Sequence, residues 1–246
     1  MIRVRADLHV HTVLSPCAEI EMIPPLIVRE ALDLGIDLIA ITDHNSTANI
    51  ESVQKAAKDT ALTVLPGMEL QTREEVHVLC LFDSLEQIEN WQKIVDSSMP
   101  DIQNDIEHFG EQFVVDETGD FIRREERLLI TSCELTLTEA YHQVARLGGW
   151  LVPAHVNRKT NGLLSILGFV PVDIPIDALE ISRHLQPEEA YAKFPQIRNY
   201  PVIQNGDVHI LGDFAGTNEF FINKISIQEL RLAVHQQEGR SHRILN

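Results

Sequence analysis

Histidine and carboxylate residues stand in short clusters along this chain, each at the end of an apolar run. The clusters are Asp-Leu-His-Val-His at 7–11, Thr-Asp-His at 42–44, Glu69, Glu-Val-His at 75–77, Pro-Ala-His at 153–155 and Gly-Asp-Val-His at 206–209. Residues two apart on a strand point to the same side, so His9 with His11, and Asp207 with His209, form converging pairs. Six of the eleven histidines end such runs, which makes unrelated core or surface histidines a poor explanation. The pattern predicts a metal centre built from strand ends.

The composition limits the size of the fold and its surroundings. A chain of 246 residues, 44% of them hydrophobic, can bury the core of one α/β domain, with or without an insertion. Charged residues appear within the first few positions, before any long apolar stretch, so we expect no signal peptide. No apolar run approaches the roughly 20 residues of a membrane-spanning helix, so we expect no membrane span. Three cysteines (Cys17, Cys80 and Cys133) show no pairing pattern, which favours a reducing cytoplasm.

The charge of the chain bears on its partners. The formal net charge is -17, so we expect no binding to an extended nucleic acid or to an acidic membrane surface. Bound divalent cations would neutralise several carboxylates and make the site locally positive. A small phosphorylated substrate is therefore compatible with this acidic chain.

Apolar strand-like runs alternate with amphipathic helical runs, as in a parallel α/β architecture. Strands are expected at 2–8, 38–42, 62–65, 76–82, 150–154, 178–181 and 202–204, and helices at 24–34, 46–59, 84–95, 137–147 and 228–235. Ser84 and Gln87 predict a capped start for the third of these helices. About seven strands, each with a polar residue at its carboxyl end, are typical of a (β/α) barrel with its site at one face.

One segment interrupts this alternation. Residues 99–131 are polar, and 113–122 within them predict a β-hairpin that turns at 117–120. We interpret the segment as an insertion within a single domain of residues 1–246. It would cap the site, contact another subunit or simply elaborate the surface. The sequence does not indicate an oligomeric state.

The clusters, in this order, resemble the motifs of the PHP (polymerase and histidinol phosphatase) superfamily of metal-dependent phosphoesterases over nearly the whole chain. The resemblance implies a distorted (β/α)7, TIM-like barrel that holds two or three divalent ions. The implied ligands fall into three groups: His9, His11, Glu69 and Asp207 at one metal; His77 and His155, with Glu69 as the bridge, at a second; and His44 and His209 at a third. Asp7 and Asp43 are interpreted as residues that orient ligands or backbone.

One position departs from the family pattern. Many small phosphatases of this superfamily carry an Asp five residues after the second His, where it serves the third metal. This chain has Pro16 there, within a Leu-Ser-Pro-Cys loop that resembles a recurring subgroup of the superfamily. Glu19 is our preferred replacement ligand, and Glu21 and Cys17 are alternatives. Otherwise the third position is weak or empty, and the centre holds two metals.

The predicted chemistry follows from two metals that share one hydroxide, lower its pKa toward neutrality and clamp a phosphoryl group for in-line displacement. Glu69 and Asp207 would be the catalytic carboxylates, and mixed His and carboxylate ligands suit Mn2+, Fe2+ or Zn2+. Arg158 and Arg183 are predicted phosphate binders, because guanidinium groups make bidentate contacts with phosphate. His184 is predicted to protonate the leaving oxygen or to contact the phosphate. For all three residues, a solvated or ion-paired loop position is equally compatible with the sequence.

The leading prediction is a metal-dependent phosphoesterase that hydrolyses a small phosphorylated metabolite, such as a nucleotide or an oligonucleotide end. One alternative is an amidohydrolase-type C–N hydrolase, which usually needs a bridging Lys carboxylate that no strand-end Lys supplies here. The other is a non-enzymatic metal-binding module. A nearly complete set of ligand motifs, with Glu69 in the bridging place, favours the phosphoesterase.

Overall fold

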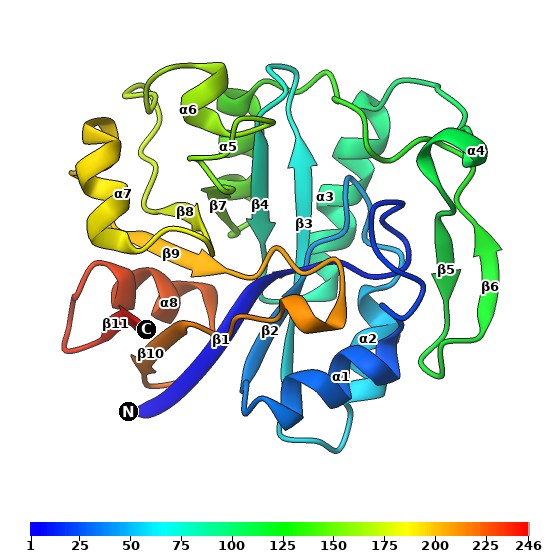
Figure 1. Cartoon of the computed structure of the whole chain (residues 1–246), viewed down its shortest axis with the longest axis horizontal. Coiled ribbons are helices and arrows are strands. Elements are labelled where there is room, and N and C mark those ends of the chain that lie inside the picture. Colours follow the sequence, from blue (N-terminus) through cyan, green and yellow to red (C-terminus); the bar gives the residue numbers. More distant parts are fainter. Residues whose placement is uncertain (246) are drawn as a thin grey trace.

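A curled, seven-stranded mixed sheet organises residues 1–245, which are the residues that the computed structural model describes (Figure 1). The strand order is β11-β10-β1-β2-β3-β4-β7. The bounds are β1 (Ile2–Val10), β2 (Leu38–Ile41), β3 (Thr63–Gln71), β4 (His77–Leu81), β7 (Trp150–Pro153), β10 (Asn218–Ile222) and β11 (Ser241–Ile244). A separate parallel pair, β8 (Leu179–Ser182) and β9 (Val202–Asn205), lies between β7 and β1 and continues the curl. The expected α/β class with a distorted, TIM-like barrel is confirmed.

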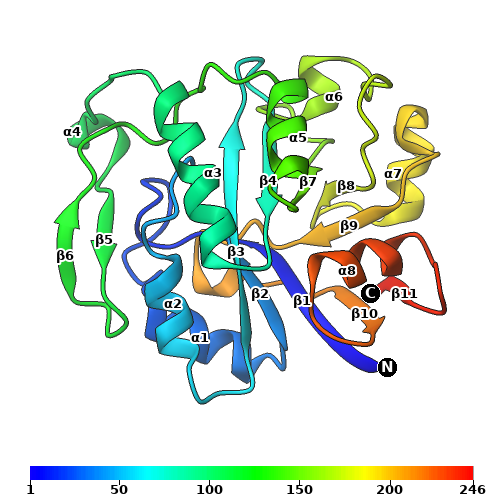
Figure 2. The same cartoon turned by 180° about the vertical axis from the view of Figure 1, so that it is seen from behind.

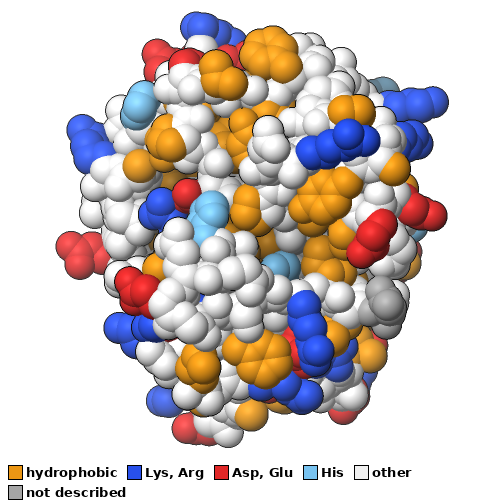
Figure 3. Space-filling model, turned by 90° about the vertical axis from the view of Figure 1, so that its left-hand side faces the viewer, with side chains coloured by type: hydrophobic (Ala, Val, Ile, Leu, Met, Phe, Trp, Pro, Cys, Tyr) orange, Lys and Arg blue, Asp and Glu red, His pale blue; other side chains and the backbone are white. Residues whose placement is uncertain are grey.

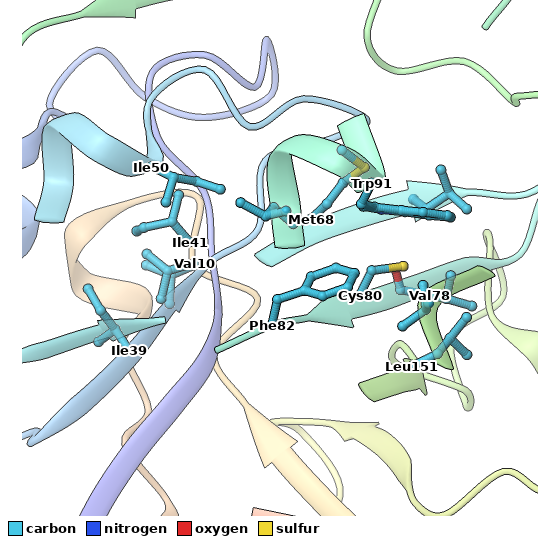
Figure 4. Close-up of a cluster of buried hydrophobic side chains, with 14 of the residues drawn as sticks. Val10, Ile39, Ile41, Ile50, Met68, Val78, Cys80, Phe82, Trp91 and Leu151 are labelled. Atoms are coloured by element: carbon cyan, nitrogen blue, oxygen red, sulfur yellow. The ribbon is translucent and has the colours of Figure 1, made fainter. Parts of the chain in front are cut away.

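Both faces of the sheet are apolar, because side chains alternate along buried strands. In β2, Leu38 and Ala40 enter one hydrophobic cluster, whereas Ile39 and Ile41 enter the other. The second cluster, shown in Figure 4, also contains Trp91.

Four helices cover the face that carries Ile39 and Ile41, and one packs on the opposite face. The four are α1 (Pro24–Asp33), α2 (Ile50–Ala57), α3 (Leu85–Ser98) and α5 (Leu137–Arg146), and the one opposite is α8 (Ile227–Val234). Figure 2 shows α3 and α5 in front of β3, β4 and β7. Shorter helices complete the chain: α4 (Ile106–Phe109), α6 (Leu163–Ile166), α7 (Pro187–Lys193), η1 (Pro195–Ile197) and η2 (Leu211–Asp213). Among residues 1–245, no helix has the length and apolar character needed to cross a bilayer.

The sheet is not parallel throughout, and here the expected parallel arrangement is wrong. Strand β4 runs antiparallel to both β3 and β7. Only residues 72–76 separate β3 from β4. A parallel pair needs a crossover of a dozen or more residues, so this short connection forces a hairpin. The hairpin places Glu69 and His77 close together.

The predicted hairpin in the 99–131 segment is confirmed as β5 (Phe113–Val115) and β6 (Phe121–Arg124). Asn49, just before α2, holds β5 in place. Its side chain donates to the Phe113 carbonyl and accepts from the Val115 N–H, both at 3.0 Å. The interpretation of this segment as an insertion stays a prediction.

Candidate metal centre

The predicted ligands converge at one end of the curled sheet, although they come from six separate segments. His9 and His11 lie at the end of β1, Glu69 in β3 and His77 at the start of β4. His44, His155 and the pair Asp207 and His209 follow the ends of β2, β7 and β9. Except for His77, Asp207 and His209, which are partly exposed, all of these side chains are buried. Their convergence is the arrangement that the strand-end pattern predicts.

Glu69 lies at the middle of this group, and its carboxylate faces five imidazole rings. Its Oε1 lies 2.8 Å from His77 Nδ1, 3.0 Å from His155 Nε2 and 3.4 Å from His9 Nε2, and its Oε2 lies 3.0 Å from His44 Nδ1 and 3.4 Å from His11 Nε2. A carboxylate with each oxygen turned to a different set of imidazoles has the geometry of a bridging ligand.

The described residues contain three groups in which all potential ligand atoms lie within 4.8 Å of one another. The groups are His9, His11, Glu69 and Asp207; His44, Glu69 and His77; and His11, His44 and His209. The first group is the one that the family resemblance implies. In the second, His44 stands where His155 was expected, although His155 also contacts Glu69. The structure brings the eight side chains together, and their role as ligands stays a prediction.

The donor set fits divalent cations, because several buried ligand-type atoms have no hydrogen-bond partner. These atoms are His9 Nε2, His11 Nε2, His44 Nδ1, Glu69 Oε2 and His155 Nδ1. Buried polar atoms are normally paired, and an unpaired one costs about 1–3 kcal/mol. The first four of these residues also belong to the clusters of potential ligands, so their unpaired atoms fit bound cations better than scattered packing defects. Imidazole and carboxylate donors suit Mn2+, Fe2+ or Zn2+.

Neighbouring charges shift the pKa values of the buried carboxylates and imidazoles of the centre. Burial alone would raise the pKa of Glu69, but the surrounding histidines hold it well below its usual range. Burial lowers the pKa of His9, yet the nearby carboxylates outweigh it and raise that pKa well above its usual range. Burial and the neighbouring His11 instead lower the pKa of His209 to about 4. The carboxylate of Glu69 is therefore anionic, whereas the pKa values of the imidazoles are shifted in opposite directions.

Asp43 acts on His11 through a serine. Ser15 Oγ donates to Asp43 Oδ1 at 2.7 Å, so it accepts the proton of His11 Nδ1 at 3.0 Å. Asp43 also accepts from the Thr12 N–H and hydroxyl, both at 2.7 Å. This contact network turns the free Nε2 of His11 toward the centre.

Asp7 orients backbone rather than an imidazole. Its carboxylate accepts N–H groups of Gly206, Ala215 and Gly216 at 2.9–3.2 Å, which fastens the loop that carries Asp207 to β1. A Cβ on Gly206 would lie 2.4 Å from the Asp213 carbonyl oxygen, so only glycine permits this approach. Asp207 itself has a left-handed backbone (φ 51°), a conformation that persists only where the surroundings hold it.

Glu180, which is 1% exposed in β8, is a further residue of the site that was not predicted from the sequence. Its carboxylate lies 3.1 Å from His9 Nδ1 and accepts the His155 N–H at 2.7 Å. The available signal was a carboxylate inside the apolar run Ala-Leu-Glu-Ile at 178–181. A charged residue is rarely buried unless it is paired, so this run already indicated a specific partner.

A polar cavity of about 420 Å3 adjoins the centre, and it is lined by Arg158, Arg183 and His184 together with Asp207 and His209. Arg158 Nη1 is paired with Asp207 Oδ2, and its side chain is 48% exposed. The Arg183 guanidinium donates to the carbonyls of Gly206 and Asp213 at 3.1 and 3.0 Å. The predicted substrate residues therefore lie beside the predicted ligands.

The loop that was expected to supply a replacement ligand lies beside the third group of histidines. The Glu19 N–H donates to the His209 carbonyl at 2.9 Å, while the Glu19 side chain is exposed. Cys17 lines both the large cavity and a smaller one of about 180 Å3 over His44 and His77. Glu19 as a ligand stays a prediction, and Cys17 stays its alternative.

A barrel-like sheet with histidines and carboxylates at its strand ends defines a metal-dependent hydrolase. Residues 7–147 match the family model described as the PHP domain, and the chain belongs to this family of phosphoesterases. The resemblance seen in the sequence is thus confirmed.

The individual proteins that resemble this chain are only distantly related to it in sequence. The 5'-3' exoribonuclease Rnm of Salmonella typhimurium is 32% identical over 80 residues, which are 30% of this chain and 26% of that protein. The lesion-specific endonuclease PfuEndoQ of Pyrococcus furiosus has the same fold, with a TM-score of 0.76 and 19% identity over 98% of this chain and 58% of that one. A complex of endonuclease Q with a 27-mer duplex that has an abasic lesion at the active site gives a TM-score of 0.70, 18% identity and the same coverage.

These comparisons correct one prediction. We expected a small phosphorylated partner and excluded extended nucleic acids because of the net charge of -17. That exclusion is wrong, since endonuclease Q, a protein with this fold, forms a complex with a 27-mer duplex, and the Salmonella relative is an exoribonuclease. The physical reason is that net charge averages over the whole surface, whereas a phosphate responds to the local field of the site.

Proposed function

We propose that this protein hydrolyses a phosphodiester of a nucleic acid at or near a strand end. The observation that carries the proposal is the 420 Å3 cavity with Arg158 and His184 directly beside the cluster of ligand atoms. Ligand sites are typically about 300–1,000 Å3, so this cavity has room for a group of nucleotide size. The named nuclease activities of the Salmonella and Pyrococcus proteins support the same class of substrate.

The metal-holding residues in this proposal are the eight clustered side chains, with Glu69 between the groups. Divalent cations held there would activate a water molecule and polarise the phosphoryl group for in-line displacement. The protein itself contributes buried, pre-oriented side chains, so that little reorganisation is needed when substrate binds. Catalysis thus depends first on Glu69 and Asp207.

The cavity residues have different tasks. One Nη of Arg158 contacts Asp207 and the guanidinium is half exposed, so its other N–H groups are available to a substrate phosphate. His184 lines the same wall and is the proposed proton donor to the leaving oxygen. Arg183 is occupied by two carbonyls and by the Asp213 carboxylate at 2.7 Å, so we assign it to holding the 206–213 loop instead of to phosphate.

The charges on one face bear on how a nucleic acid would be held there. On the face drawn in Figure 3, Lys and Arg side chains are interspersed with Asp and Glu, and no continuous basic surface forms there. A broad basic patch would give strong, salt-dependent binding along a duplex. On this face, the proposed contacts to a nucleic acid are therefore those of the site itself, through Arg158 and the metal-holding residues.

The proposal is tested with oligonucleotides labelled at the 5' or the 3' end, single-stranded and duplex, in the presence of Mn2+. We expect metal-dependent release of short products, and chelation should abolish it. Glu69→Gln and Asp207→Asn should lower both metal content and the rate, the rate by about 10²-fold or more. Glu51→Gln, on the exposed face of α2, is the control and should change neither. A protein with bound metal that cleaves none of these substrates would contradict the proposal.

A further inference from the structure

Glu180 is the meeting point of a buried hydrogen-bond network behind the metal centre. Its Oε1 accepts from Asn205 Nδ2 at 2.7 Å, and its Oε2 accepts the His155 N–H at 2.7 Å. Both oxygens lie 3.1 Å from His9 Nδ1. Glu180, Asn205 and His155 also form part of the wall of the 420 Å3 cavity, whereas His9 does not line it.

The network fixes the orientation of each amide in it. Asn205 Oδ1 accepts the Leu8 N–H and an N–H of Asn218, both at 2.8 Å, so the oxygen of Asn205 must point away from Glu180. The amide nitrogen of Asn205 therefore donates to Glu180. Since the His155 backbone is also a donor, both Glu180 oxygens act as acceptors, and the remaining partner, His9 Nδ1, must carry a proton.

A proton on Nδ1 has a direct consequence for the other nitrogen of the ring. His9 Nε2 lies 3.4 Å from Glu69 Oε1 and 3.4 Å from Asp207 Oδ1, where a metal would be held. Only a nitrogen with a free lone pair can bind a metal. An acceptor at Nδ1 is what keeps Nε2 available.

We propose that Glu180 is a positioning residue of the metal centre, which holds His9 with its proton on Nδ1 and its Nε2 free for metal. It also binds the N–H of His155, whose backbone is left-handed (φ 28°), and so fixes the turn that presents this second ring. The inference rests on the metal-binding part of the proposed function and is independent of the nucleic-acid substrate.

The decisive variant is Glu180→Gln. Glutamine has the same shape as glutamate, but it offers one acceptor oxygen to the three donors that now bind Glu180 (the Asn205 amide, the His155 N–H and His9 Nδ1). Its amide group would face His9 Nδ1 or another donor, and the favourable response is a shift of the His9 proton to Nε2. We expect a 10–100-fold loss of metal affinity, the usual effect of removing such a partner. Metal affinity is measured by competition with a chelator, and the protonated nitrogen of His9 by nitrogen-15 NMR of the Zn2+-loaded protein.

A matched control is Glu219→Gln, because Glu219 is also a buried strand glutamate (2% exposed) but pairs with Arg3 and Arg243 away from the centre. It should leave metal affinity and the His9 signals unchanged. Glu180→Asp keeps the charge and should retain more affinity than the Gln variant.

Wild-type affinity in Glu180→Gln would overturn the inference. If that variant does not fold, the nitrogen-15 NMR measurement on the wild type tests the inference by itself. A His9 proton on Nε2 would overturn the inference, and a proton on Nδ1 would support it. Because both readouts concern metal and tautomer, they stay informative even if no nucleic acid is cleaved.

Discussion

At the scale of single residues, Arg158 connects metal binding to substrate binding. Its guanidinium contacts Asp207, a predicted ligand, and still presents donors to the cavity. Arg158→Ala should raise the KM for an oligonucleotide by about 10-fold, since a hydrogen bond to a charged group contributes about 1.5–3 kcal/mol. Metal content should be retained, because the eight candidate ligands remain.

Steady-state kinetics together with elemental mass spectrometry would check this expectation. Lys159→Ala, which removes the neighbouring exposed charge, is the control. An unchanged KM in Arg158→Ala would mean that the arginine only braces Asp207. Arg158→Lys should restore part of the effect, because lysine keeps the charge but not the planar fork.

The convergence of the candidate ligands could be predicted from the sequence because each ends an apolar run, and strand ends meet at one side of a sheet. Among the residues that orient them, Asp7 and Asp43 could be predicted because each stands beside a candidate ligand, whereas Glu180 and Asn205 could not. Glu180 reaches His9 across 171 positions of the chain, and Asn205 reaches Leu8 across 197. No local pattern encodes such pairs, since they exist only after the sheet has curled. The local sequence indicates such a pair only through a charged residue inside an otherwise apolar strand.

At the scale of elements, helix α5 starts with a capping box, in which Thr136 Oγ1 accepts the Glu139 N–H and Glu139 accepts the Thr136 N–H. Thr136→Ala should lower the free energy of unfolding by about 1 kcal/mol, the typical contribution of a cap. Chemical denaturation would measure this loss. Thr138→Ala, two residues further in the same helix, is the control and should cost less. Equal losses in the two variants would contradict a capping role.

Helices and strands could be predicted where the spacing of apolar residues along the chain reveals them. They were missed where the strand depends on partners far away in the sequence. Helix α3 begins after Ser84 as expected, with the Ser84 hydroxyl accepting the Gln87 N–H. Strand β10 was missed because Asn218 and Glu219 make it look polar. Both are nevertheless buried, Asn218 against Gln204 and Asn205, and Glu219 against two arginines. Tertiary partners decide such a strand.

Strand β11 contains a histidine that should make stability depend on pH. His242 Nε2 donates to Asn218 Oδ1 at 3.0 Å, and burial lowers the pKa of His242 to about 4 from an ordinary 6.5. Between these values the unfolded chain binds a proton that the folded chain does not. The contribution is therefore fully present above about pH 6.5 and is lost as the pH falls toward 4.

Thermal unfolding of the wild type and of His242→Gln at pH 7.5 and 4.5 would test this. Glutamine can still donate to Asn218 but does not titrate. The wild type should lose more of its melting temperature on acidification than the variant does. Parallel losses would show that His242 does not contribute to the pH dependence.

At the scale of the whole molecule, the candidate ligands tie together segments between residues 9 and 209. Metal that binds only the folded chain stabilises it by about 2.7 kcal/mol at 100 times its Kd. We therefore expect Mn2+ to raise the melting temperature by roughly 5–10 °C relative to the chelated protein. Asp207→Asn should lose most of that increase. An equal increase in the variant would place the stabilising ions elsewhere.

The interior position of β1 in the sheet also has a consequence for biosynthesis. This strand lies between β2 and β10, and it pairs with β10 through Ile2–Ile222 to Ala6–Asn218. At about 5–20 residues per second, a ribosome needs roughly 10–40 s to make the partner after β1 has emerged. The loop with Asp207 and His209 is made almost as late. Metal capture is thus expected as a closing step of maturation, and a nascent chain arrested before residue 206 should retain no metal.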